Sequence, residues 1–256
     1  MALVNKNFED LFEFSRASEA TYWDSNGVLQ IAGVDEPRFD HDILTGEPKG
    51  ILIEGSATNT VPHETVSGFF TVTDASNSFW GDAGDYLIPG GERFYQLVNN
   101  DASSSFYRYR NTAAYYPGED TDTITMSIFV KKGTAVNSKY FGFFTLGDAR
   151  ARFDLEEGTV VTEFGPDTKA RIQRISEDTF RCSITAPKGD FTRVCLVLFQ
   201  DAPDTWIGDA SSSYGQYHWL GGFQIELGEY PTSYIPTSGS PVTRAEDLIN
   251  IPISGV

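Results

Sequence analysis

Apolar and polar residues alternate with a period of two over most of this chain, as they do in β-strands that bury one face. In residues 106–110, for example, two tyrosines share one face, and a phenylalanine and two arginines share the other. Other stretches rich in β-branched and aromatic residues predict strands at 69–73, 123–130, 139–146, 149–155, 159–164, 170–176, 180–186, 193–200 and 217–226. Turn signals such as Lys-Gly, Glu-Gly and Gly-Pro-Asp separate them. The pattern therefore predicts an all-β protein built as an antiparallel β-sandwich or barrel.

The first sixty residues have a different texture. Short strands are expected at 28–31 and 51–54, with a turn-rich stretch between them, and residues 7–13 have the pattern of a short helix. Strands this isolated need a partner surface against which to bury. We therefore expect residues 1–60 to form an extended N-terminal arm that packs on the main domain or on a neighbouring subunit.

The rest of the chain is expected to form one domain and a tail. The sandwich should span residues 61–240, and residues 241–256 should form a C-terminal tail. The prolines within residues 231–236 suit an edge or a connector better than a central strand.

The charge of the chain limits its partners. Its 36 acidic and 19 basic residues give a formal net charge of −17. Nucleic-acid binding needs clustered cations, so nucleic acid is not expected as a partner. Long-range repulsion also disfavours anionic membranes and strongly anionic polymers, which leaves neutral glycans, proteins and divalent cations. Without a run of 18 apolar residues or a basic segment followed by an apolar one at 1–10, neither a membrane span nor a cleaved signal is expected.

The two cysteines, Cys182 and Cys195, lie in apolar runs on either side of Lys188-Gly189. A two-residue turn at Lys188-Gly189 would place the two side chains opposite each other in a hairpin. The sequence leaves open whether they form a disulfide or stay as buried thiols.

Motifs for catalysis are missing. The three histidines have no zinc-binding spacing, and the chain contains no GxSxG, P-loop or GxGxxG motif. A glycosidase would need two carboxylates about 5 to 10 Å apart, and the informative acids within strands are Asp154 and Glu226. The simpler alternative is that each acid caps a strand end or pairs with an arginine. We therefore predict that the protein is not an enzyme.

Two kinds of loop could bind a ligand. Three acids after Pro117-Gly118 could hold a structural calcium ion, although solvated acidic loops are the usual meaning of such a cluster; they are Glu119, Asp120 and Asp122. No other cofactor is expected. Aromatic residues in loops could stack on sugar rings, because loops lie at the surface. These candidate ligand-binding residues, whose alternative role is local packing, are Trp206, Tyr214, Tyr115, Tyr116 and Trp80.

Several segments resemble one family of proteins. At the N-terminal end they are Phe14-Ser15-Arg16-Ala17-Ser18-Glu19-Ala20-Thr21-Tyr22, Gly27-Val28-Leu29-Gln30, Pro37-Arg38-Phe39-Asp40, 44–54 and Thr58-Asn59. Downstream they are Phe153-Asp154-Leu155, Gly158-Thr159-Val160, 180–183, 224–228, 231–237 and Val242-Thr243-Arg244-Ala245. Together these segments resemble virion proteins of tailed phages, of the tail-fibre, head-spike or head-fibre type. The resemblance is weaker between Val61 and Tyr116, and Phe180 stands where the family commonly has tryptophan.

The resemblance implies a jelly-roll sandwich similar to carbohydrate-binding modules, a location in the virion, contacts with other virion proteins and assembly as a homotrimer. The expected function is therefore attachment or capsid decoration by a β-sandwich that presents a surface for host glycan. Two alternatives remain. One is a purely structural decoration or fibre base without a ligand, and the other is a polysaccharide depolymerase. A fold alone does not establish carbohydrate binding.

Overall fold

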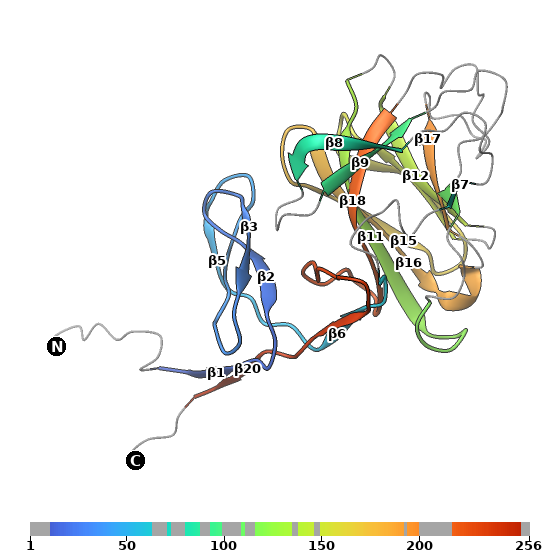
Figure 1. Cartoon of the computed structure of the whole chain (residues 1–256). Coiled ribbons are helices and arrows are strands. Elements are labelled where there is room, and N and C mark those ends of the chain that lie inside the picture. Colours follow the sequence, from blue (N-terminus) through green and yellow to red (C-terminus); the bar gives the residue numbers. More distant parts are fainter. Residues whose placement is uncertain are drawn as a thin grey trace. The chain divides into compact units, whose positions relative to one another are not determined.

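The computed structural model describes residues 11–62, 71–72, 80–87, 93–98, 109–110, 116–134, 138–145, 149–191, 194–199 and 217–251. These residues form two compact units. Unit 1 combines Met1–Ala57 with Thr243–Val256, and unit 2 is Thr58–Val242. Apart from the three-residue 3-10 helix η3 (Lys188–Asp190), the regular elements of the described residues are β-strands, as predicted (Figure 1). The described residues include no helix long and apolar enough to cross a membrane.

Unit 2 is a sandwich of two six-stranded antiparallel sheets. Sheet I has the order β14 (Thr159–Phe164), β13 (Arg150–Asp154), β12 (Tyr140–Thr145), β17 (Val194–Phe199), β10 (Tyr109–Arg110) and β7 (Thr71–Val72). Sheet II has the order β15 (Lys169–Arg174), β16 (Thr179–Pro187), β11 (Thr123–Lys132), β18 (Tyr217–Leu227), β9 (Arg93–Val98) and β8 (Trp80–Leu87). The chain passes repeatedly from one sheet to the other, as in a sandwich and not a meander (Figure 1).

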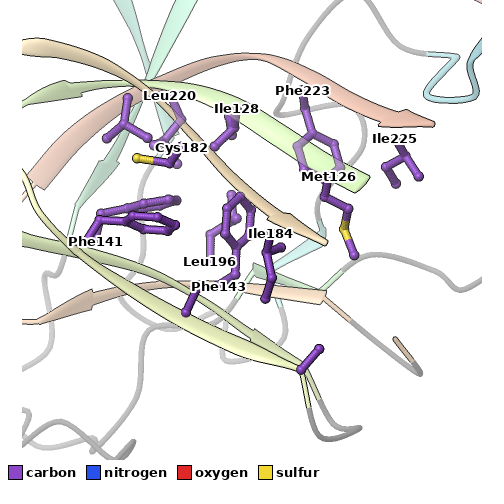
Figure 2. Close-up of a cluster of buried hydrophobic side chains, with 14 of the residues drawn as sticks. Met126, Ile128, Phe141, Phe143, Cys182, Ile184, Leu196, Leu220, Phe223 and Ile225 are labelled. Carbon is purple, nitrogen blue, oxygen red and sulfur yellow. The ribbon is translucent and has the colours of Figure 1, made fainter. Parts of the chain in front are cut away.

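The core of unit 2 lies between these sheets. Every second residue of β11 and β16 points inward, and the inward set is fully buried: Ile124, Met126, Ile128, Val130, Phe180, Cys182, Ile184 and Ala186. Sheet I contributes Phe141 and Phe143, both labelled in Figure 2, together with Phe153. The ring centroids of these three residues lie 5.6 to 6.3 Å apart. Burying each of these large side chains stabilises the fold by about 1.5–3 kcal/mol. The other residues of the same strands must therefore form the outer faces of the sandwich.

The predicted hairpin between the two cysteines is wrong. β16 lies in sheet II and β17 in sheet I, and η3 carries the chain between the sheets. Lys188-Gly189 therefore forms part of a crossover. Cys182 is a free, buried thiol, and burial raises the pKa of this thiol well above its ordinary value. The side chain of Cys195 lies outside the described residues.

Unit 1 is built from short antiparallel pairs. Its strands are β1 (Glu13–Ser15), β2 (Ala20–Trp23), β3 (Leu29–Ala32), β4 (Phe39–His41), β5 (Pro48–Ile51) and β20 (Leu248–Asn250), paired as β1–β20, β2–β3 and β4–β5. β6 (Ala57–Asn59) and β19 (Val242–Arg244), which contain the two points where the chain leaves and re-enters unit 1, pair with each other. The described part of the expected helix is not helical, because Glu13 already belongs to β1.

Candidate functional site

The predicted loop aromatics lie mostly beyond the described residues. Trp206, Tyr214 and Tyr115 fall outside them, and Trp80 lies in β8 with only its backbone described. Tyr116 is described. It packs against the core of unit 2, with its ring centroid 6.3 Å from that of Phe191. This contact is the local packing that was the alternative role of Tyr116, and ligand contact through the rest of its partly buried ring stays a prediction.

The predicted calcium-binding acids form a turn that is tied to η3. The Asp122 carboxylate accepts a hydrogen bond of 2.7 Å from the backbone N–H of Glu119. The carbonyl of Asp120 accepts one of 2.9 Å from Gly189 N–H, and the Asp120 carboxylate lies 3.6 Å from Lys188 Nζ. Over the described part of the chain, no group of three or more His, Cys, Asp or Glu side chains is placed to hold a metal ion.

Asp154 has a structural role at the end of β13. Its carboxylate accepts hydrogen bonds of 2.9 and 3.0 Å from the N–H groups of Glu156 and Glu157, and it lies 3.2 Å from Lys139 Nζ. The hydrogen bond to Asp154 is the main reason that the pKa of Lys139 is raised. Asp154 therefore caps a strand end, as its simpler alternative role requires, although its ionic partner is a lysine.

The outer face of sheet II is polar, yet most of it is buried. Its inner strands present Thr125, Ser127, Ser183, Thr185, Gln224 and Glu226. Residues 228–237, here called the strap, follow β18 and cover this face. Thr125 Oγ1 donates to the carbonyl of Gly228 at 2.8 Å, and the ring of Tyr234 meets Phe129 edge-on at 5.6 Å. As predicted for its prolines, the strap is a connector without strand structure.

Glu226 anchors the strap. One carboxylate oxygen accepts from the Gln224 amide at 2.6 Å and from Thr232 N–H at 3.0 Å, and the other accepts from Thr232 Oγ1 at 2.7 Å. Burial raises the pKa of Glu226, although these hydrogen bonds oppose the shift. Arg181 adds a hydrogen bond of 2.7 Å to the carbonyl of Thr232. Glu226 thus fastens one element to another, and among the described residues no second carboxylate takes part in these hydrogen bonds.

At the edge of sheet II the polar face opens to solvent. The outward residues of β15 are Lys169, Arg171 and Gln173, because Ala170 and Ile172 pack on the core. Next to them Tyr230, in the strap, is 59% exposed, and the Arg171 guanidinium carbon lies 4.3 Å from its ring centroid. We call Tyr230 with these three β15 side chains the Tyr230 face.

The Tyr230 face has the chemistry of a sugar-binding surface. An exposed aromatic ring can stack on the CH-rich face of a sugar, and neighbouring N–H donors can bind its hydroxyls. Tyr230 was not among the predicted ligand-binding residues, which were aromatics in other loops. The sequence signal for this surface is the alternation of polar and apolar residues over 169–173, which places three polar side chains on one face.

Unit 1 has a buried ionic centre, here called the arginine cluster. Arg16, Arg38 and Arg244 are among the largest fully buried side chains, and they surround Asp247 and Glu54. Arg16 Nη1 lies 3.0 Å from Asp247 Oδ1, Arg38 forms an ion pair with the other Asp247 oxygen, and Arg38 Nη1 lies 2.8 Å from Glu54 Oε2. Arg244 Nη2 lies 3.6 Å from the same Glu54 oxygen. The cluster thus connects four separate stretches of unit 1.

Backbone groups complete this centre. Arg16 Nη2 donates to the carbonyls of Gly33 at 2.7 Å and Glu36 at 2.9 Å, and Asp247 accepts from Glu54 N–H at 2.8 Å. Burial raises the pKa of Asp247, but hydrogen bonds from Glu54 N–H, Arg16 and Arg38 outweigh this effect, so its net pKa is lowered. A buried carboxylate with this many donors stays ionised.

No family model and no curated protein matches the sequence. Among solved structures, an arabinose-bound MgGH51 α-L-arabinofuranosidase matches with a TM-score of 0.40 at 10% identity, covering 70% of this chain and 27% of the enzyme. The CBM22-1 xylan-binding domain of Paenibacillus barcinonensis Xyn10C matches with a TM-score of 0.35 at 10% identity, covering 68% and 94%. The CBM22-1–GH10 modules of Clostridium thermocellum xylanase Xyn10B, complexed with xylohexaose, match with a TM-score of 0.35 at 12% identity, covering 86% and 30%. Similarities of this size assign neither a family nor a function to the chain.

Proposed function

We propose that this chain is a non-enzymatic virion protein of a tailed phage, attached through unit 1 and presenting unit 2 as a glycan-binding β-sandwich. The contacts with other virion proteins and the homotrimeric assembly implied by the sequence resemblance belong to the same proposal. The attachment role is supported by the arginine cluster. The segments that carry the resemblance at both ends of the chain supply Arg16, Arg38, Glu54 and Arg244, and these residues meet in one centre.

Glycan binding is supported by the Tyr230 face. Tyr230 is exposed on a strap whose backbone is held by Glu226 and Arg181, so the ring is positioned before a ligand arrives. A prearranged site loses less conformational entropy on binding. A single aromatic platform binds sugars weakly, but several copies on one particle would raise the effective concentration and hence the avidity.

A non-catalytic role is favoured by the two acids that could have served a glycosidase. Asp154 caps the end of β13 in sheet I, and Glu226 fastens the strap to sheet II. Both carboxylates already accept hydrogen bonds from the chain itself. Both side chains are also buried, so a glycosidic oxygen could reach them only by displacing parts of the chain.

A purely structural role is the second candidate function, and one observation favours it. The strap occupies the centre of the outer face of sheet II, so that part of the face is closed to a ligand. If this reading holds, the sandwich serves as a rigid decoration or fibre base without a glycan.

Two experiments test the proposal. Glycan-array binding of the full chain should detect at least one host-surface glycan, and Tyr230→Ala should lose it while Tyr230→Phe, which keeps the ring, retains most of it. Trp206→Ala and Tyr214→Ala test the predicted loop aromatics in parallel. The absence of any glycan signal for the wild type would leave the structural role. Mass spectrometry of purified particles should detect the chain, and its absence from them would contradict the virion role.

A further inference from the structure

We infer that the Tyr230 face selects sugars that carry a carboxylate, such as uronic or sialic acids. This inference rests on the glycan-binding function proposed above and adds the chemical class of the ligand. Three features of the face lead to it step by step: an available positive charge, an aromatic platform beside it, and a strap that holds the two together.

The first step is the charge of Arg171. Within the described residues no carboxylate lies within ion-pair distance of its guanidinium, which donates to the carbonyl oxygen of Glu229 at 3.3 Å. Three surface lysines of unit 2, by contrast, are paired: Lys131 with Asp178, Lys139 with Asp154 and Lys188 with Asp120. Arg171 therefore keeps N–H donors for an external anion, and a guanidinium binds a carboxylate through two parallel hydrogen bonds.

Lys169 adds to this positive charge. It lies two residues from Arg171 on the same outward row of β15. Its Nζ lies 3.9 Å from the Glu229 carboxylate, and both side chains are more than half exposed. An ion pair this exposed contributes little, so Lys169 can turn to a ligand at small cost. Gln173, on the same row and exposed, supplies neutral donors and an acceptor for hydroxyls.

The second step is the platform. The Arg171 guanidinium lies 4.3 Å from the Tyr230 ring centroid, a cation–π contact that fixes the direction of both groups. A pyranose that stacks on the exposed part of the Tyr230 ring would bring its ring substituents beside this guanidinium. A sugar with a carboxylate gains an ion pair there, and a neutral sugar does not.

The third step is the strap. Thr232, two residues after Tyr230, donates twice to the buried Glu226, and its carbonyl accepts from Arg181. Further along, Ile235 N–H donates to Gln224 at 2.8 Å. The platform is thus anchored to sheet II by polar contacts beneath it, and Arg171 is anchored by the same sheet.

The net charge of −17 opposes anionic polymers at long range, and the sequence alone favours neutral glycans for that reason. At an ionic strength of 0.15 M, however, charges are screened beyond about 8 Å, and a contact ion pair is screened much less. Once a sugar contacts the Tyr230 face, the nearby cations Lys169 and Arg171, and not the net charge of the chain, therefore determine whether an acidic or a neutral sugar binds more tightly.

The test is calorimetric titration of the full chain with oligosaccharides matched in everything but charge, at 0.15 M salt. The probes are trigalacturonate, trimannuronate and sialyllactose, each against its own methyl ester. The wild type should bind at least one acidic probe about tenfold more tightly than its neutral counterpart, the worth of one charge-assisted contact. Arg171→Gln should remove this preference, and Tyr230→Ala should remove binding to both members of the pair.

Lys49→Gln is the matched control, because it removes one partly exposed cation from unit 1 and should leave binding unchanged. Thermal unfolding checks that each variant is folded. Equal affinity for acidic and neutral probes, or a preference that survives Arg171→Gln, would overturn the inference and leave glycan binding standing. If no probe binds and the glycan array is also silent, both the inference and the proposed glycan-binding function fail.

Discussion

At the scale of single residues, His218 shows how burial fixes a protonation state. The ring is fully buried in unit 2, its Nδ1 accepts from Gly133 N–H at 3.2 Å, and its Nε2 lies 3.1 Å from the carbonyl of Tyr140. Because Gly133 can only donate and Tyr140 O can only accept, the ring is the neutral tautomer with the proton on Nε2. Burial lowers the pKa of His218 to about 4.

The first prediction concerns acid stability. With a folded pKa of about 4 against an ordinary value of 6.5, the folded state binds the proton less readily than the unfolded one. The contribution of neutral His218 to the free energy of unfolding is fully present above pH 6.5. It is lost as the pH drops from 6.5 to 4, by at most about 3 kcal/mol. Urea unfolding across this range should show a larger loss for the wild type than for His218→Gln, which cannot titrate. Parallel profiles for the two proteins would contradict this account.

The second prediction concerns Glu226. Its pKa is raised above 4.5, so its ionisation weakens the fold, and stability is lost as the pH rises from 4.5 through the folded pKa. Glu226→Gln keeps acceptors for Gln224 and Thr232 N–H and removes the buried charge. This variant should be as stable as the wild type at pH 8 or more stable, with a flatter dependence on pH.

Glu226→Ala is the contrasting variant. It leaves Thr232 N–H and the Gln224 amide without their acceptor and should cost about 1–3 kcal/mol at any pH. Urea unfolding at pH 5 and pH 8 separates the two cases. If Gln and Ala destabilise equally at pH 8, Glu226 holds the strap through its charge, and the hydrogen-bond account is wrong.

At the scale of elements, the strap depends on one backbone conformation. Gly228 begins it with φ +129°, in a region that side chains rarely adopt, and its N–H donates to Thr123 O at 2.9 Å. An added Cβ would meet nothing within 4 Å, so the backbone angle alone resists substitution. The turn from β18 into the strap therefore requires glycine.

The third prediction follows from this turn. Gly228→Ala should destabilise unit 2 by about 1–3 kcal/mol. It should also speed hydrogen exchange of the Thr232 and Ile235 amides, which are protected by their hydrogen bonds to Glu226 and Gln224. Gly55→Ala is the matched control. Its Cβ would also enter open space, but its φ is not in the left-handed region, so it should be neutral or slightly stabilising. Unchanged exchange in Gly228→Ala would show that strain at this residue does not control the strap.

The strands of unit 2 could be predicted well from the sequence, because their alternation is strong. The stretches 123–130, 149–155, 159–164 and 180–186 correspond closely to β11, β13, β14 and β16. Strand pairing was harder to predict, because the alternation indicates which residues face inward but not which strands lie next to each other in a sheet. The hairpin turn predicted at Lys188-Gly189 was therefore wrong, because the same residue types occur in hairpin turns and in crossovers between sheets.

In unit 1 local patterns were weaker guides. The strand expected at 51–54 lies at Pro48–Ile51, because Leu52 N–H bonds to Arg38 O and Glu54 turns to the arginine cluster. No local signal indicated that Leu248–Asn250 pairs with Glu13–Ser15 across more than 230 positions. Such pairing depends on buried arginines, whereas sequence patterns usually assign arginine to the surface.

At the scale of the whole molecule, the two units are stabilised by different kinds of interaction. Unit 2 has a continuous apolar core, and unit 1 has a buried ionic centre with short strand pairs around it. Removing one partner from a buried ion pair leaves an uncompensated charge and costs about 3–5 kcal/mol. A change in the arginine cluster should therefore affect unit 1 selectively.

The fourth prediction is that Asp247→Asn separates the stabilities of the two units. The isosteric amide leaves Arg16 and Arg38 without their shared carboxylate, so unit 1 should unfold at a much lower temperature while the transition of unit 2 stays in place. Because the pKa of Asp247 is lowered, the same loss should appear in the wild type only as the pH falls below 3.8. Differential scanning calorimetry at pH 7 measures both transitions.

Lys49→Gln again serves as the control, because its ion pair with Asp42, 3.5 Å long and nearly half exposed, should contribute less than about 1 kcal/mol. A single transition that shifts as a whole in Asp247→Asn would mean that unit 2 cannot stay folded without unit 1. The two units would then unfold as one cooperative structure. Two transitions, of which only that of unit 1 shifts, would instead show that unit 2 folds independently of unit 1, which both ends of the chain build.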